Sequence, residues 1–169
     1  ILCLGLGSPT ALYWVLFLLA AYALVKALLF FSAGIINKQY NSMRSESIHS
    51  LFILQPLPAV GLIVGCLALI GTPLLPIFLP KLILLSQVAS VSVTLLYILL
   101  MLFVVVAVAF VLFLLKIMAP KDRLPVRQKV PTSMKAPVVI LIVMIVLLGL
   151  FMPRWLHAIL QSVVAGLGW

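Results

Sequence analysis

The chain has 169 residues, of which 66% are hydrophobic and 8% are charged. A soluble domain carries roughly a quarter charged residues, so this composition excludes a water-soluble globular protein and makes the bilayer the solvent. Eleven Lys and Arg against two Asp and Glu give a net charge of +9. Most of this positive charge falls between the apolar runs, which indicates basic loops of a membrane protein and no role in nucleic-acid binding.

The apolar runs predict an all-α membrane protein with about five transmembrane helices in a single membrane domain, residues 1–169. A helix needs roughly 18 to 20 apolar residues to cross about 30 Å of hydrocarbon, and runs of this length recur along the chain. A β-barrel would need segments of alternating polarity, and these runs do not alternate. The expected helices span residues 11–36, 51–70, 74–90, 92–115 and 138–152.

Two polar segments are the main connections between these helices. Residues 37–50 carry a net charge of +1, and residues 116–136 carry six basic residues and one acid, a net +5. Counting the expected spans puts the two segments on opposite sides of the membrane. The positive-inside rule then predicts that the loop 116–136 is cytoplasmic.

Lys26 interrupts the first apolar run about ten residues from its nearer end. At 1.5 Å per residue this is roughly 15 Å of depth, which a lysine stem cannot cross to reach water. A charge at such depth costs several kcal/mol and usually marks an ion or proton path. The alternative is a lysine paired with a neighbouring helix purely for assembly. Tyr22, one turn earlier, is placed to solvate the amine.

Lys81 follows three prolines, Pro73, Pro76 and Pro80, within a short apolar stretch. Proline lacks the backbone donor that a helix needs, so the sequence predicts a broken helix near Pro76 to Lys81. Irregular backbone at membrane depth is tolerated where it is covered by protein or lines a wet cavity, as in transporters. The alternative is that the prolines lie at the membrane surface and Lys81 anchors the start of a helix.

Hydroxyl side chains follow Lys81 at helical spacing. Ser86, Ser90 and Thr94 recur every four residues, so a single helix would carry them on one face. They are candidates for holding water beside Lys81. Small hydroxyl residues also pack helices closely, and that reading stays open.

The sequence offers no cofactor or metal site. Cys3 and Cys66 lie far apart in apolar sequence, without the spacing of a metal site, an iron–sulfur cluster or a disulfide framework. His49 and His157 are placed at the membrane interface. We therefore expect no cofactor, no metal and no catalytic residue in this chain.

Two segments resemble the antiporter-like subunits of respiratory complex I, membrane-bound hydrogenases and Mrp-type cation/proton antiporters. Residues 23–34, Ala-Leu-Val-Lys-Ala-Leu-Leu-Phe-Phe-Ser-Ala-Gly, look like the lysine-bearing tenth helix of that family. Gly71, Pro73, Phe78 and Lys81 keep the spacing of its Gly-x-Pro-Pro-x-x-Gly-Phe-x-x-Lys stretch at the broken twelfth helix. The resemblance implies that the five expected helices correspond to helices ten to fourteen of the antiporter-like fold.

The resemblance implies a proton-translocating membrane subunit of a redox-driven complex, itself without catalytic chemistry. An Mrp-type sodium/proton antiporter subunit and a structural remnant without transport are the alternatives. The residues implied in translocation are Lys26, Lys81, Tyr22, Ser86 and Ser90. The implied partners are other membrane subunits, including a chain carrying the missing N-terminal half, and the lipid bilayer. The implied location is an energy-transducing membrane: a prokaryotic cell membrane or an organellar inner membrane.

Overall fold

The computed structural model describes residues 9–40, 50–119, 130–151 and 153–166, and the expected all-α membrane fold with a broken helix is confirmed. Three helices in this part of the chain, α1, α5 and α6, are long and apolar enough to cross a membrane. The helices are α1 Pro9–Tyr40, α2 Leu51–Leu54, α3 Pro56–Ile70, α4 Phe78–Val91, α5 Val93–Met118, α6 Thr132–Leu150 and α7 Arg154–Gly166.

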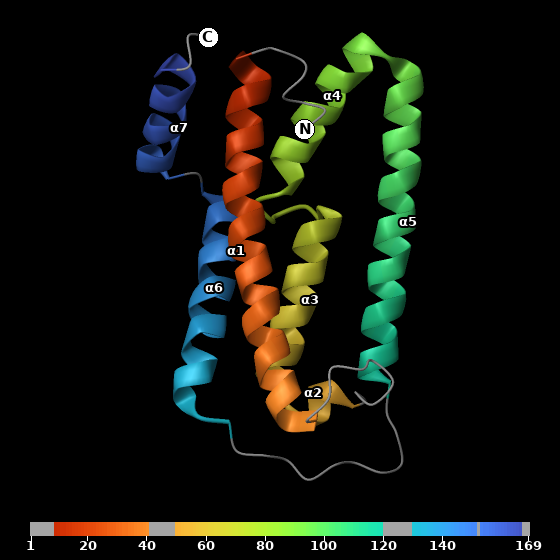
Figure 1. The fold of residues 1–169 in the computed structure, drawn as a ribbon, viewed down its shortest axis with the longest axis vertical. Coiled ribbons are helices and arrows are strands. Elements are labelled where there is room, and N and C mark those ends of the chain that lie inside the picture. Colours follow the sequence, from red (N-terminus) through yellow and green to blue (C-terminus); the bar gives the residue numbers. More distant parts are fainter. Residues whose placement is uncertain (1–8, 41–49, 120–129, 152, 167–169) are drawn as a thin grey trace.

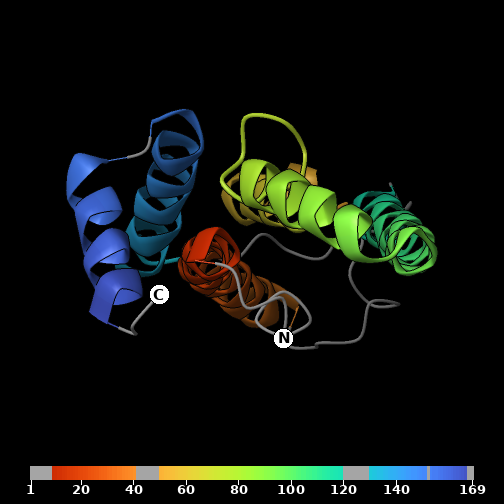
Figure 2. The same cartoon turned by 90° about the horizontal axis from the view of Figure 1, so that it is seen from above.

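Helix α1 is the centre of the arrangement. Its 32 residues give a length of about 48 Å, and α3, α4, α6 and α7 all pack against it. Seen from above, α6 and α7 lie on one side of α1, and α4 and α5 on the other (Figure 2). The main core contains Val25, Leu28 and Ile35 of α1, which pack with Ala68 of α3 and Ile145 of α6. These apolar side chains face their neighbours because α1 is covered on several sides.

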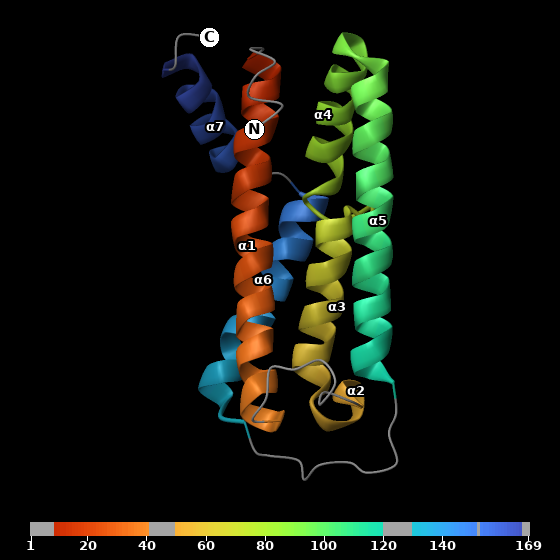
Figure 3. The same cartoon turned by 45° about the vertical axis from the view of Figure 1, so that its right-hand side comes forward.

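Helices α3 and α4 form one membrane crossing together. With 15 and 14 residues they are about 22 Å and 21 Å long, and each alone falls short of about 30 Å of hydrocarbon. They follow one another end to end, α3 beside one half of α1 and α4 beside the other, and both pack on α5 (Figures 1 and 3). The apolar ranges 51–70 and 74–90 therefore make a single broken crossing.

Because α3 and α4 form a single crossing, the polar segments that follow α1 and α5 start at the same end of the molecule. The backbone N–H of Ser50 donates to the carbonyl of Ala119 at 3.1 Å, and α2 packs on α5. The C-terminal end of α1 and the C-terminal end of α5 therefore lie at the same end of the molecule (Figure 1). The structure differs here from the opposite placement expected from counting spans. Residues 41–49 and 120–129 lie outside the described residues.

Two glycines allow α3 to approach α1 closely. A Cβ atom on Gly65 would lie 2.5 Å from Cδ2 of Leu29, and one on Gly61 would overlap the hydroxyl oxygen of Ser32. The same atom on Gly61 would lie 3.2 Å from Cγ1 of Val138 on α6. The Gly61–Gly65 pair, four residues apart, is the small-residue pattern that lets membrane helices pack backbone to backbone.

The helix bounds differ from the expected ranges by several residues, and two of these differences involve prolines. Pro56 occupies the first turn of α3, where its missing donor costs nothing, so the apolar run 51–70 is divided after Leu54. Helix α6 begins at Thr132, six residues before the expected start, and includes Pro137 in its second turn.

Helix α7 was not among the expected helices. Leu160 and Val164, one turn apart, are buried while most of its other residues are exposed, so α7 is amphipathic. It packs against α1, where the Tyr13 hydroxyl and the His157 ring are joined by a hydrogen bond and an edge-to-face contact.

Candidate functional site

The break between α3 and α4 spans residues 71–77 and begins with a well-formed helix end. Gly71 has φ of 88°, a left-handed conformation that only glycine adopts without strain. Its N–H donates to the carbonyl of Ala68 at 3.1 Å, and the N–H of Thr72 donates to that of Leu67 at 3.2 Å. These two bonds are the Schellman pattern. They leave the last carbonyl of α3, that of Ile70, for another donor.

The prolines lie where their missing donors do least harm. Pro73 and Pro76 are in the irregular segment, and Pro80 is in the first turn of α4, where an N–H would have no helical partner. The observed break thus precedes the expected position, Pro76 to Lys81, by several residues. Lys81 is already in α4, with its N–H bonded to the carbonyl of Ile77 at 3.2 Å.

The break is seated against α6. Leu74 has φ of 74°, a strained conformation for a residue with a branched side chain. A Cβ atom on Gly149 of α6 would overlap the carbonyl oxygen of Leu74 and lie 3.0 Å from Cα of Leu75. The absence of a side chain at Gly149 therefore lets the irregular backbone lie directly on α6.

The side chain of Lys81 turns back across the break to the end of α3. Its Nζ donates to the carbonyl of Ile70 at 2.9 Å and lies 3.9 Å from the centre of the Phe103 ring on α5. The C-terminal end of a helix carries a partial negative charge, and an aromatic face attracts cations. Three elements thus surround one ammonium group: the carbonyl end of α3, the first turns of α4 and the ring from α5.

Opposing effects act on the ammonium group of Lys81, and its side chain passes close to Gly71. The carbonyl and the aromatic ring both favour the charged form of Lys81, whereas its half-buried position penalises that form. The lysine also lies close to Gly71, because a Cβ atom there would be 3.2 Å from Cδ of Lys81 and 3.5 Å from Nζ. A side chain at position 71 would crowd this path of the Lys81 side chain.

Lys26 lies in a different environment. It is exposed on the surface of α1, on a stripe that also carries Leu19, Ala23 and Phe30 at helical spacing. The neighbouring Val25 faces the main core. Lys26 therefore points away from the helices that pack on α1, while Lys81 contacts α3 and α5.

The hydroxyl groups do not gather around Lys81. The hydroxyls of Ser86 and Ser90 are exposed and donate to carbonyls of their own helix, those of Ile83 and Gln87, at 2.7 Å each. The chain turns at Ser92, which caps α5, so the face expected to continue to Thr94 ends with α4.

Tyr22 is half-buried and packs against the main core. It lies one helical turn from Lys26, as the sequence requires.

Three groups at the broken crossing were not anticipated from the sequence. The carbonyl of Ile70 carries no side-chain signal, and Phe103 lies in a run of 21 uninterrupted apolar residues, 95–115, where no position stands out. Gly149 did carry a signal, since it is the single glycine in the apolar run 138–152. A lone glycine in a helical pattern often marks a close backbone approach.

A family model matches this chain. The family model described as NADH:quinone oxidoreductase/Mrp antiporter, transmembrane, matches residues 1–110 of the 169. The match includes α1, the broken crossing and the larger part of α5, and so contains Lys26, Lys81 and Phe103. A search of curated proteins found no match to this chain.

Proposed function

This chain belongs to the NADH:quinone oxidoreductase/Mrp antiporter transmembrane family, and from that premise we propose that it is a proton-translocating subunit of a redox-driven membrane complex. It is an integral membrane protein of the antiporter-like class. The observation that carries the proposal is the Lys81 ammonium held against the open end of α3 inside a broken crossing. Half-helix ends of this kind line the ion sites of transporters.

The chemistry follows from the two protonation states of Lys81. The charged amine donates to the Ile70 carbonyl and lies over the Phe103 ring, and both attractions weaken when the proton leaves. The neutral amine is then free to leave the helix end. A change in nearby charge, arriving from a neighbouring subunit, shifts the balance between the two states. In this mechanism Lys81 accepts a proton from one side and releases it to the other.

Lys26 is the second translocating group in this proposal. Its exposed position on α1 requires a protein or water environment, because a charge facing lipid at this depth is costly. The sequence has only two acids, Glu46 and Asp122, and both lie in the polar segments between helices. The counter-charge for Lys26 is therefore a carboxylate on another membrane segment. This requirement supports assembly with other membrane subunits.

The orientation follows from the shared end of α1 and α5. The segments 37–50 and 116–136 carry net charges of +1 and +5, and together they account for +6 of the net +9. Because both connect helix ends that meet at the Ser50 and Ala119 hydrogen bond, we assign that end to the cytoplasm. The membrane is an energy-transducing one, a prokaryotic cell membrane or an organellar inner membrane.

A second candidate function is a subunit of an Mrp-type sodium/proton antiporter, because the matching family includes both kinds of complex. In that case transport would depend on sodium and would need no electron donor. A structural subunit without transport is the third possibility. It requires the lysines only for assembly.

The deciding experiment measures proton translocation by the assembled complex in proteoliposomes. Lys81→Ala should abolish coupled translocation while the complex still assembles. Lys81→Arg should also fail, because guanidinium stays charged at all relevant pH values and cannot exchange a proton. Lys38→Ala, which removes an exposed lysine at the end of α1, is the matched control and should pump normally.

The same assay separates the alternatives. A sodium requirement without any electron donor would favour the antiporter. Full pumping by well-assembled Lys81→Ala and Lys26→Ala complexes would contradict a transport role and favour the structural subunit. Loss of assembly in Lys26→Ala, rescued by Lys26→Arg, would assign that lysine to an ion pair.

A further inference from the structure

One face of α1 is exposed along the central and C-terminal parts of the helix. Its residues follow one another at intervals of four, three, four and seven: Leu19, Ala23, Lys26, Phe30 and Asn37. We call this face the α1 seam. Spacings that alternate between four and three residues, with a mean period of about 3.5, keep side chains in line with one adjacent helix. The seam therefore has the residue pattern of a contact with one further helix.

Lys26 lies in the seam close to the middle of α1. Counting along Pro9–Tyr40, it is about 25 Å from the first residue and about 21 Å from the last. The hydrocarbon extends about 15 Å to either side of the bilayer centre, so the lysine stem does not bring this ammonium to water. A charged side chain at such depth pairs with an opposite charge or faces a wet cavity.

Charge complementarity identifies what the further helix carries. The sequence has only two acids, Glu46 and Asp122, and both belong to the polar segments between the apolar runs. A second copy of residues 1–169 therefore brings no carboxylate to the depth of Lys26, and the hydrocarbon of a lipid brings none either. The inference rests on the counter-charge that the proposed function requires for Lys26. Its source is an Asp or Glu within a transmembrane helix outside residues 1–169.

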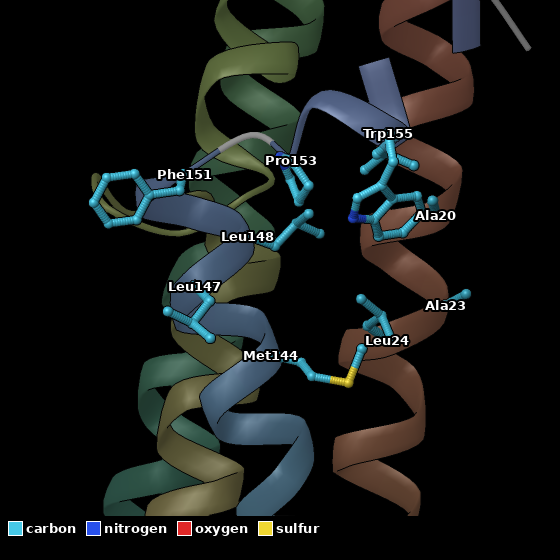
Figure 4. A pocket seen from close by; sticks show the side chains of 10 residues that line it. Ala20, Ala23, Leu24, Met144, Leu147, Leu148, Phe151, Pro153 and Trp155 are labelled. Carbon is cyan, nitrogen blue, oxygen red and sulfur yellow. The ribbon is translucent and has the colours of Figure 1, made fainter. Parts of the chain in front are cut away.

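An apolar groove of about 810 Å³ adjoins the seam, between α1, α6 and α7. Ala20 and Ala23 line it on α1, and Met144 lines it on α6 (Figure 4). The groove lies at membrane depth, because the end of α6 packs on the break and Trp155 lies beside Ala20, in the central part of α1. Ala23 belongs to both the groove and the seam. A side chain from the further helix can therefore enter the groove one turn from Lys26.

We propose that the α1 seam and this groove bind one transmembrane helix of a partner, which carries a carboxylate opposite Lys26 and a large apolar side chain one turn away. The carboxylate pairs with the ammonium at mid-depth, and the apolar side chain fills the groove beside Ala23. Lys26 and Ala23 are about 4.5 Å apart along α1, so positions i and i+3 or i+4 on one face of the partner helix supply both contacts. The small side chains of Ala23 and Ala27 let the two backbones approach closely.

Photo-cross-linking in the complex as isolated from its native membrane tests this arrangement. Benzoylphenylalanine replaces Leu19 in one variant and Phe30 in another, because these large seam residues, 59% and 76% exposed, flank Lys26. Mass spectrometry of the cross-linked peptides locates the two attachment points. We expect both on one apolar helix, about eleven residues apart, with an Asp or Glu about four residues from the Phe30 attachment. A large apolar residue should follow one turn further toward the Leu19 attachment.

Exchanging the two charges tests the ion pair. Lys26→Glu places two carboxylates together and should lower the recovery of assembled complex by about tenfold or more. Replacing the acid found by cross-linking with lysine, in the same complex, should restore most of the recovery. Lys38→Glu, the same substitution near the end of α1, is the matched control and should leave assembly unchanged.

Attachment of both probes to lipid alone, or to a second copy of the chain, would overturn the proposal. The same holds for a cross-linked helix without an acid within one turn of the expected position, and for a charge exchange that fails to restore assembly. Proton translocation is not the readout. A complex that shows both attachments and the rescue but does not pump would contradict the proposed function and support the docked helix.

Discussion

Replacing Gly149 by alanine tests whether the break depends on its contact with α6. The added Cβ would overlap the carbonyl oxygen of Leu74 and lie 3.0 Å from its carbonyl carbon. Alanine improves helix propensity by about 1 kcal/mol relative to glycine. Overpacking costs about 1 to 3 kcal/mol, and here the upper end applies because the obstacle is backbone rather than a flexible side chain. We expect a net destabilisation of about 1 to 2 kcal/mol.

The matched control is Gly34→Ala on α1, where an added Cβ would meet no atom within 4 Å. This variant should gain up to about 1 kcal/mol from helix propensity alone. The assay is the rate at which the buried thiol of Cys66 reacts during mild denaturation in detergent, in a Cys3→Ser background. We expect about tenfold faster labelling for Gly149→Ala than for the unmodified chain. Labelling of Gly149→Ala as slow as that of Gly34→Ala would refute the contact.

Two further predictions concern the lysine site and the topology. In a double-mutant cycle, Phe103→Leu and Lys81→Met should show a coupling of about 0.5 to 2 kcal/mol in unfolding free energy, because the ammonium lies 3.9 Å from the ring centre. A coupling energy near zero would mean that the Phe103 ring does not interact with the Lys81 ammonium. Lys38→Cys and Ala119→Cys should both react with an impermeant thiol reagent from the cytoplasmic side, since α1 and α5 end together. Labelling from opposite faces would contradict the single broken crossing.

The fold class could be predicted because membrane helices need only length and apolarity. The break could be predicted as well, because Pro73, Pro76 and Pro80 withdraw donors that a helix needs. The end-to-end arrangement of α3 and α4 could not be predicted, because the apolar run 51–70 is long enough to cross a membrane by itself. Gln55 and Pro56 were the signal that the helix starts later, and they shorten it to 15 residues.

The candidate site was only partly accessible from the sequence. The importance of Lys81 and its position near the break could be anticipated, since a lysine beside prolines in an apolar sequence is unusual. The groups that contact Lys81 could not be anticipated, because tertiary packing alone brings a backbone carbonyl and an aromatic ring to the ammonium group. The amphipathic helix α7 was missed because Pro153 and Arg154 suggested that the last span simply ended there. The four-residue spacing of Leu160 and Val164 was the available signal.

Because neither α3 nor α4 crosses the membrane alone, the break between them affects how the chain is inserted during synthesis. The broken crossing precedes α5 and α6 in the chain, yet Phe103 and Gly149, which contact Lys81 and the break, belong to these later helices. While the ribosome is still producing α5 and α6, the irregular backbone between Ile70 and Phe78 has neither its aromatic cover nor its seat on α6. Exposed backbone groups are costly in lipid. The break is therefore seated only after α6 has been inserted, and a nascent chain truncated before α6 would be a substrate for membrane quality control.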